Sequence, residues 1–152
     1  MRTALFPGSF DPFTKGHADI VGRGLALFDG IVIAVGHNVA KPGWIPVQER
    51  VEALRRYYAE ETRVRVEQYA GLTVDFATEV GVAAILRGVR CLKDFEYERE
   101  IAQVNRQLTG LETVLLLADP QLSALSSSTV RELAFFGRNI QEFLPVGLKY
   151  NL

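Results

Sequence analysis

Gly8-Ser9-Phe10-Asp11-Pro12-Phe13-Thr14-Lys15-Gly16-His17 is the stretch that decides the fold of this chain. An apolar run at residues 3–6 precedes it and predicts a strand, and residues 18–28 follow it and predict a helix. The first turn of a helix carries unpaired N–H groups and a partial positive charge, which favour phosphate. A charged histidine beside a phosphate can donate two hydrogen bonds. This context favours a phosphate site over the alternative, an ordinary strand–turn–helix junction in which the histidine has no role.

Length and composition indicate the class of protein. A chain of 152 residues that is 48% hydrophobic and 23% charged is typical of one globular domain, which we expect to span residues 1–152. The net charge of −1 gives no broad basic field, so we expect neither nucleic acid nor a membrane as a partner. The single cysteine, Cys91, excludes a disulfide framework within the chain and fits a cytoplasmic location. The sequence shows no signal peptide, and no apolar run approaches the roughly 18 residues of a membrane span.

Strand and helix patterns alternate along the chain. The predicted strands are residues 3–6, 30–35, 64–69, 83–86 and 113–117, and the predicted helices are 18–28, 46–58, 73–80, 94–108, 128–136 and 140–143. Apolar and polar residues alternate at 64–69, which predicts an edge strand, whereas the continuous apolar run at 113–117 predicts a fully buried strand. Residues 129–132 fit a capping box. The order predicts an α/β fold, a doubly wound five-stranded parallel sheet with ligands at the carboxyl ends of its strands.

Candidate polar groups follow every predicted strand. Because the carboxyl ends of parallel strands meet at one edge of the sheet, these groups would surround a single cleft. In strand order they are residues 8–17, Lys41, Leu72-Thr73, Arg87-Gly88-Val89-Arg90 and Ser126-Ser127-Ser128. Arginine offers a planar fork for phosphate, although two exposed arginines could also simply pair with Asp94 or Glu96. Helix capping explains one or two of the three serines. His37 and Cys91 lack partners at catalytic or metal spacing, so we expect a loop residue and a packing residue.

Three segments resemble a known family. Residues 8–17 resemble the (H/T)-x-G-H nucleotidyltransferases, and Thr14 with G-S-F-D-P before it is similar to bacterial phosphopantetheine adenylyltransferases. R-G-V-R-C-L-K-D-F-E-Y-E at 87–98 resembles the family's R-G-(L/V)-R-x-x-x-D-F-E-Y-E. L-S-S-S-T-V-R-E at 125–132 is similar to I-S-S-S-x-(V/I)-(R/K)-E, although Leu122-Ser123-Ala124 departs from the family's aromatic-Ser-Phe triplet. The resemblance implies a Rossmann-like nucleotidyltransferase fold.

The resemblance also implies roles for individual residues. His17 would act on the α-phosphate in the transition state. Contacts with ATP would come from Ser9, Phe10, His17, Gly88, Val89, Arg90, Glu98, Leu122, Ser123, Ala124, Leu125, Ser126, Ser127 and Ser128. Contacts with the second substrate would come from Ser9, Lys41, Thr73 and Arg87.

The implied reaction is transfer of AMP from ATP to 4′-phosphopantetheine, which gives dephospho-coenzyme A and pyrophosphate. The attacking phosphate oxygen is already anionic near neutral pH, because the second pKa of a phosphate monoester is about 6, so no general base is required. Mg²⁺ would be carried by the ATP phosphates, with few protein ligands. The resemblance further implies a homohexamer and feedback inhibition by coenzyme A.

Two alternatives stay open at this point. Another nucleotidyltransferase of the superfamily, with a different phosphate acceptor, would usually carry histidine at position 14. A nucleotide- or coenzyme A-binding regulator without catalysis would be expected to have lost His17 or Arg90, and both are present.

Overall fold

The computed structural model describes all residues from Met1 to Leu152 and contains one parallel five-stranded sheet. The strands lie in the order β3-β2-β1-β4-β5, so the predicted sheet is confirmed. Their bounds are β1 Thr3–Gly8, β2 Gly30–Gly36, β3 Val64–Tyr69, β4 Ala84–Val89 and β5 Glu112–Leu117. The helices are α1 Lys15–Gly24, α2 Val47–Tyr57, α3 Thr73–Val80, α4 Leu92–Thr109 and α5 Ser127–Phe135, with 3₁₀ turns at Pro120–Leu122 and Gln141–Phe143.

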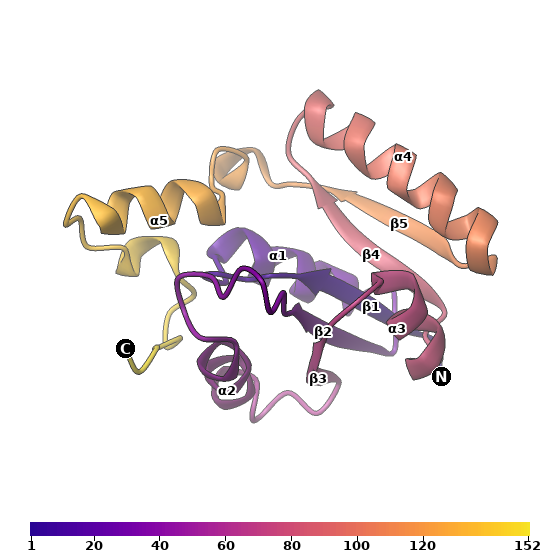
Figure 1. Cartoon of the computed structure of the whole chain (residues 1–152), viewed down its shortest axis with the longest axis horizontal. Helices are drawn as coiled ribbons and strands as arrows, with labels where there is room; N and C mark the ends of the chain where they lie inside the picture. The colour runs from indigo at the N-terminus through magenta and orange to yellow at the C-terminus, as the bar shows by residue number, and fades with distance from the viewer.

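The strand sequences divide their side chains between two cores because successive residues of a strand point to opposite faces. Ala4 and Phe6 of β1 belong to the larger core, with residues of α1, α2 and the C-terminal segment. Leu5, between them, belongs to the smaller core, with Val74 and Ala77 of α3. Figure 1 shows α4 beside β4 and β5, and α5 set apart from the sheet with the C-terminal segment. None of these helices combines the length and the hydropathy that a membrane span requires.

The strand order fixes where the sheet can bind a ligand. The chain runs outward through β1, β2 and β3, and then returns to place β4 on the other side of β1. Crossovers therefore leave β1 and β4 in opposite directions, and the carboxyl ends of these two strands border an open crevice. Gly8 ends β1 and Val89 ends β4, so residues 8–17 and 87–90 meet at this point.

Among the differences from the predicted element boundaries, the C-terminal ends of two elements differ by three or more residues. Strand β4 continues through Arg87, Gly88 and Val89, which pair with residues 115–117 of β5, so these residues belong to the strand and not to the loop after it. Helix α1 ends at Gly24, before the predicted 28. A Cβ at Gly24 would lie 2.7 Å from Leu86 Cδ2, which shows how closely this end of α1 packs on the sheet.

Three other local predictions are wrong. Strand β5 lies at the edge of the sheet, and its residues are partly or fully exposed; a continuous apolar run does not by itself place neighbours on both sides of a strand. Cys91 is exposed in the residue before α4, not packed inside. Helix α5 is capped by Ser126, whose Oγ accepts the N–H of Thr129, so 129–132 is not the capping box. Three consecutive serines offer several possible caps, and the sequence does not choose among them.

Candidate active site

Thr14 and His17 form a capping box at the start of α1. Thr14 is the N-cap, and its Oγ1 accepts the His17 N–H at 3.4 Å. The Thr14 N–H in turn donates to His17 Nδ1 at 3.0 Å, so the imidazole fills the role that Glu or Gln has in an ordinary capping box. The three-residue spacing of Thr and His is therefore a requirement of the helix start, and it also fixes the orientation of the ring.

This geometry determines which ring nitrogen of His17 carries the proton. Because Nδ1 accepts a main-chain hydrogen bond, the ring proton is on Nε2, which is left as a single donor. The rings of Phe10 and Phe13 surround the imidazole, with centroids 5.0 and 5.3 Å from its own. Burial, followed by the charges of Arg87 and Arg90, lowers the pKa of His17 from 6.5 to about 3. His17 therefore offers one ring donor, the Nε2–H, and not the two that a charged imidazole would have.

The loop before α1 is shaped by close packing of its own residues. Phe10 has a φ of 50°, a left-handed conformation that is uncommon for a residue other than glycine, and its ring is buried. A Cβ at Gly8 would lie 2.9 Å from that ring, so only glycine fits at the end of β1. The buried Phe10 ring thus packs beside the end of β1, where Gly8, Ser9 and Phe10 line the crevice.

Two cavities open at the carboxyl ends of the strands. The first, here called the histidine cavity, has a volume of about 410 Å³ and includes Gly16, His17 and Arg90 in its wall. The second, the lysine cavity, has a volume of about 630 Å³ and includes Lys41, Thr73 and Asn105. Six residues line both cavities and form what we call the shared wall: Pro7, Gly8, Ser9, Arg87, Glu98 and Arg131. The crevice is thus a pair of adjoining sites separated by polar and cationic groups.

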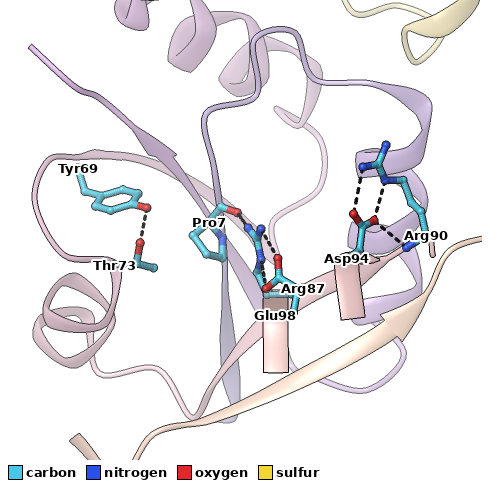
Figure 2. Close-up of polar contacts among 7 residues, drawn as sticks. All are labelled: Pro7, Tyr69, Thr73, Arg87, Arg90, Asp94 and Glu98. Atoms are coloured by element: carbon cyan, nitrogen blue, oxygen red, sulfur yellow. Dashed lines mark hydrogen bonds and ion pairs between the residues drawn. The ribbon is translucent and has the colours of Figure 1, made fainter. Parts of the chain in front are cut away.

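Two arginines of this crevice are held by carboxylates of α4, as Figure 2 shows. Arg87 donates through Nε and Nη2 to both oxygens of the buried Glu98, at 2.9 and 2.7 Å, and through Nη1 to the carbonyl of Pro7. Arg90 donates to the carboxylate of Asp94, at 3.0 Å from its Nε. The predicted alternative of ion pairing is therefore correct for Arg90, whereas Arg87 pairs with Glu98 and not with Glu96. Both guanidinium groups also line the crevice.

The structure gathers nearly all of the predicted site residues. In the lysine cavity it places Ser9, Lys41, Thr73 and Arg87, and the Thr73 hydroxyl lies 2.7 Å from that of Tyr69 (Figure 2). In the histidine cavity it places Ser9, Phe10, His17, Gly88, Arg90, Glu98, Leu122, Leu125, Ser126, Ser127 and Ser128. It does not bring Val89, Ser123 or Ala124 to either wall, since Val89 is buried at the end of β4 and Ala124 is exposed outside. His37 follows β2 directly, in a loop as expected, and lines the lysine cavity.

Comparison with known proteins decides the family. A family model described as cytidylyltransferase-like matches residues 5–133. Over 144 residues, 53% are identical to a phosphopantetheine adenylyltransferase of Porphyromonas gingivalis, with 95% of this chain and 94% of that one covered. A phosphopantetheine adenylyltransferase of Bacteroides fragilis is 48% identical over 149 residues, with 98% and 99% covered. The chain belongs to the phosphopantetheine adenylyltransferase family.

Solved structures of more distant proteins agree on the fold. A crystal structure of NadR protein in complex with NAD and AMP-PNP superposes with a TM-score of 0.62 at 18% identity, over 90% of this chain and 43% of that one. At this identity the likeness shows a shared fold alone. The resemblance to phosphopantetheine adenylyltransferases is confirmed by relatives that match over nearly the whole chain.

The three serines that this adenylyltransferase family member carries at the start of α5 each have a separate partner. Ser126 caps the helix, and Ser127 Oγ donates to the carbonyl of Pro12 at 2.7 Å. Ser128 Oγ accepts from Arg131 Nη2 at 3.1 Å. One hydroxyl therefore starts the helix and the next attaches it to the loop that follows β1. This attachment explains why more serines are present than capping requires.

Sequence reasoning missed Arg131 as a member of the site. Its Nη1 donates to the carbonyl of Asp11 at 2.7 Å, and its guanidinium is part of the shared wall. Unlike Arg87 and Arg90, Arg131 forms no ion pair with a carboxylate. The only signal was its place in the segment at 125–132, where the family carries Arg or Lys. No group of three or more His, Cys, Asp or Glu side chains is placed to hold a metal ion.

Proposed function

We propose that this chain transfers AMP from ATP to 4′-phosphopantetheine, giving dephospho-coenzyme A and pyrophosphate, with ATP in the histidine cavity and 4′-phosphopantetheine in the lysine cavity. The observation that carries the proposal is the shared wall, where two separate cavities meet at cationic and main-chain donors. A reaction between two phosphate groups needs two such sites side by side, with one boundary at which the reacting atoms approach.

The chemistry follows from the reactants. An oxygen of the 4′-phosphate attacks the α-phosphorus of ATP, the new P–O bond forms, and the bond to the bridging oxygen of the β-phosphate breaks, so that pyrophosphate leaves with that electron pair. The nucleophile needs no deprotonation at neutral pH. The neutral His17 donates its Nε2 proton in a hydrogen bond to an α-phosphate oxygen, where negative charge develops in the transition state.

The cationic groups would divide between the two substrates. Lys41 and Arg87 face the lysine cavity and would hold the 4′-phosphate. Arg90 and the N-terminal turn of α5, with its serine hydroxyls, face the histidine cavity and would hold the β- and γ-phosphates. Mg²⁺ would enter as part of the ATP substrate, since this ion commonly keeps several waters and binds substrate phosphates.

Further properties expected from the family belong to this proposal. A homohexamer is supported by a set of exposed apolar side chains on α4 and β5: Leu92, Phe95, Ile101, Val104, Leu108 and Leu117. Inhibition by coenzyme A is supported by its chemistry, because it joins the nucleotide and pantetheine halves that the two cavities would hold separately. We also propose that residues 1–152 act as one domain and that the enzyme works in the cytoplasm.

Pyrophosphate release by the purified chain tests the function. With ATP and Mg²⁺ present, 4′-phosphopantetheine should support turnover, whereas nicotinate mononucleotide and glycerol 3-phosphate, assayed in parallel, should not. His17→Ala should lower kcat by about 10²–10³-fold with little change in ATP affinity, as is typical for the loss of a transition-state donor. Turnover with another acceptor, or binding of ATP without turnover, would contradict the proposal in favour of one of the two alternatives.

A further inference from the structure

Asp11 is a buried carboxylate whose partners lie on another loop. Its Oδ2 accepts the N–H of Trp44 and its Oδ1 accepts the N–H of Ile45, both at 2.8 Å. A buried carboxylate is costly unless hydrogen bonds compensate it, and the two main-chain donors supply these bonds. Asp11 therefore holds the end of residues 37–45, which we call the lysine loop because Lys41 lies within it.

Gly43 allows this contact. Its φ is +81°, and a Cβ at this position would lie 2.8 Å from Asp11 Oδ2. Both the backbone conformation and the close approach exclude an ordinary side chain. The lysine loop can press against the carboxylate only because this residue is glycine.

Arg50, also buried, fixes the same end of the loop from the other side. Its Nε donates to the carbonyl of Ile45 at 2.8 Å, and its Nη1 donates to the carbonyls of Ser9 at 2.7 Å and Gly36 at 3.2 Å. These carbonyls belong to the lysine loop, the shared wall and the end of β2. A single guanidinium thus ties both ends of the lysine loop to the loop that follows β1.

Lys41 itself has no side-chain anchor. Its ammonium group forms no ion pair with a carboxylate, and its main-chain N–H donates to the carbonyl of Asn38 at 3.0 Å. The next fixed point along the chain is Trp44, three residues later, a span of about 10 Å at most. The position of Lys41 is therefore set by this short segment and by what holds its downstream end.

We infer that Asp11 and Arg50 are positioning residues that set the distance of Lys41 from the acceptor phosphate. Neither needs to touch the reacting atoms; they act by fixing the lysine loop against Ser9 of the shared wall. The inference rests on the proposed function, in which Lys41 binds the 4′-phosphate.

Asp11→Asn tests the inference with an isosteric change that puts an amide nitrogen against one of the two main-chain donors. We expect KM for 4′-phosphopantetheine to rise on the order of tenfold, the scale of one lost charge-assisted hydrogen bond, while the calorimetric Kd for ATP stays within about twofold. In a Lys41→Ala background the same change should add less than about twofold, because the residue that it positions is gone. The inference would be overturned if the effects of Asp11→Asn and Lys41→Ala on KM were fully additive, or if Asp11→Asn weakened ATP binding as much as it raised KM for 4′-phosphopantetheine.

A glycine pair provides a second test that does not depend on how well Asp11→Asn folds. Gly43 and Gly81 both have a φ of +81°, but a Cβ at Gly81 meets nothing within 4 Å. Gly43→Ala should reproduce the effect on KM for 4′-phosphopantetheine, and Gly81→Ala, which carries a similar backbone strain, should not. Equal effects of the two changes on KM, or no effect of Gly43→Ala, would overturn the close-contact argument.

Trp44 gives a readout that is independent of activity. It is the only tryptophan of the chain, so quenching of its fluorescence by acrylamide reports on the lysine loop directly. Quenching should increase in Asp11→Asn and Gly43→Ala but not in Gly81→Ala, and unchanged quenching in the first two would contradict the inference. A wild-type enzyme without turnover would refute the proposed function, whereas the variants at 11 and 43 test the positioning role alone.

Discussion

His17→Gln should remove a large part of the acid sensitivity of this protein. In the folded state the pKa of His17 is lowered to about 3 by burial and by the charges of Arg87 and Arg90, whereas 6.5 is its ordinary value. Above pH 6.5 the ring is neutral in the folded and the unfolded protein, and it makes no pH-dependent contribution to stability. As the pH falls below 6.5, His17 takes up a proton in the unfolded chain but not in the folded protein. The free energy of unfolding therefore decreases with acidification.

The magnitude follows from the pKa difference. Each pH unit between the two pKa values costs about 1.4 kcal/mol, so the loss at pH 5 is about 2 kcal/mol. This value requires only that the folded pKa lies well below 5, and it does not depend on the depth of the shift. Glutamine is the appropriate replacement because its side-chain oxygen can accept the Thr14 N–H that His17 Nδ1 accepts.

Urea denaturation of the ligand-free protein at pH 7.5 and pH 5.0 measures the effect. The wild-type protein should lose about 2 kcal/mol more than His17→Gln between the two conditions. His37 and all carboxylates are present in both proteins, so their contributions to the free energy of unfolding cancel in the difference. Equal losses in the two proteins would mean that His17 is protonated in the folded state near pH 5, and would refute its assignment as a neutral donor.

Three further predictions concern the division of the crevice. Arg87→Ala should raise KM for 4′-phosphopantetheine more than KM for ATP, and Arg90→Ala should do the reverse, because of these two arginines only Arg87 lines the lysine cavity. Both KM values should be measured for each variant, and equal effects on the two substrates would contradict this division. Arg131→Gln keeps a hydrogen-bond donor toward the carbonyl of Asp11 but loses the charge, so kcat should fall about tenfold or more with an unchanged Tm; a wild-type kcat would limit Arg131 to a structural role. Lys41→Arg should restore only part of the turnover that Lys41→Ala loses, because a guanidinium needs a fixed fork geometry. The loss of turnover should persist at high salt, and its disappearance there would indicate a long-range field effect in place of direct contact.

The sequence predicted the elements that local pattern alone specifies. Strands β2 and β3 and helix α3 lie within a residue of their predicted bounds, since their apolar spacing and flanking turns are unambiguous. The boundary at Val89 was missed because a charged residue, Arg87, and a glycine, Gly88, interrupt the apolar run. Pairing with β5 is the reason that they extend the strand. The burial of β5 was wrong because exposure depends on sheet order, which an apolar run does not encode.

The sequence by itself determined the parallel α/β fold, the strand–loop–helix junction that leads into α1 and the residues that resemble one adenylyltransferase family, because these depend on short-range spacing and on local motifs. Only the tertiary structure decided which nitrogen of His17 carries the proton, that Glu98 holds Arg87, and that Arg131 stands between the two cavities. The lysine loop shows the physical reason. Asp11 and Ile45 are 34 residues apart, and their hydrogen bond exists only because β1 and β2 pair side by side and bring the following loops together.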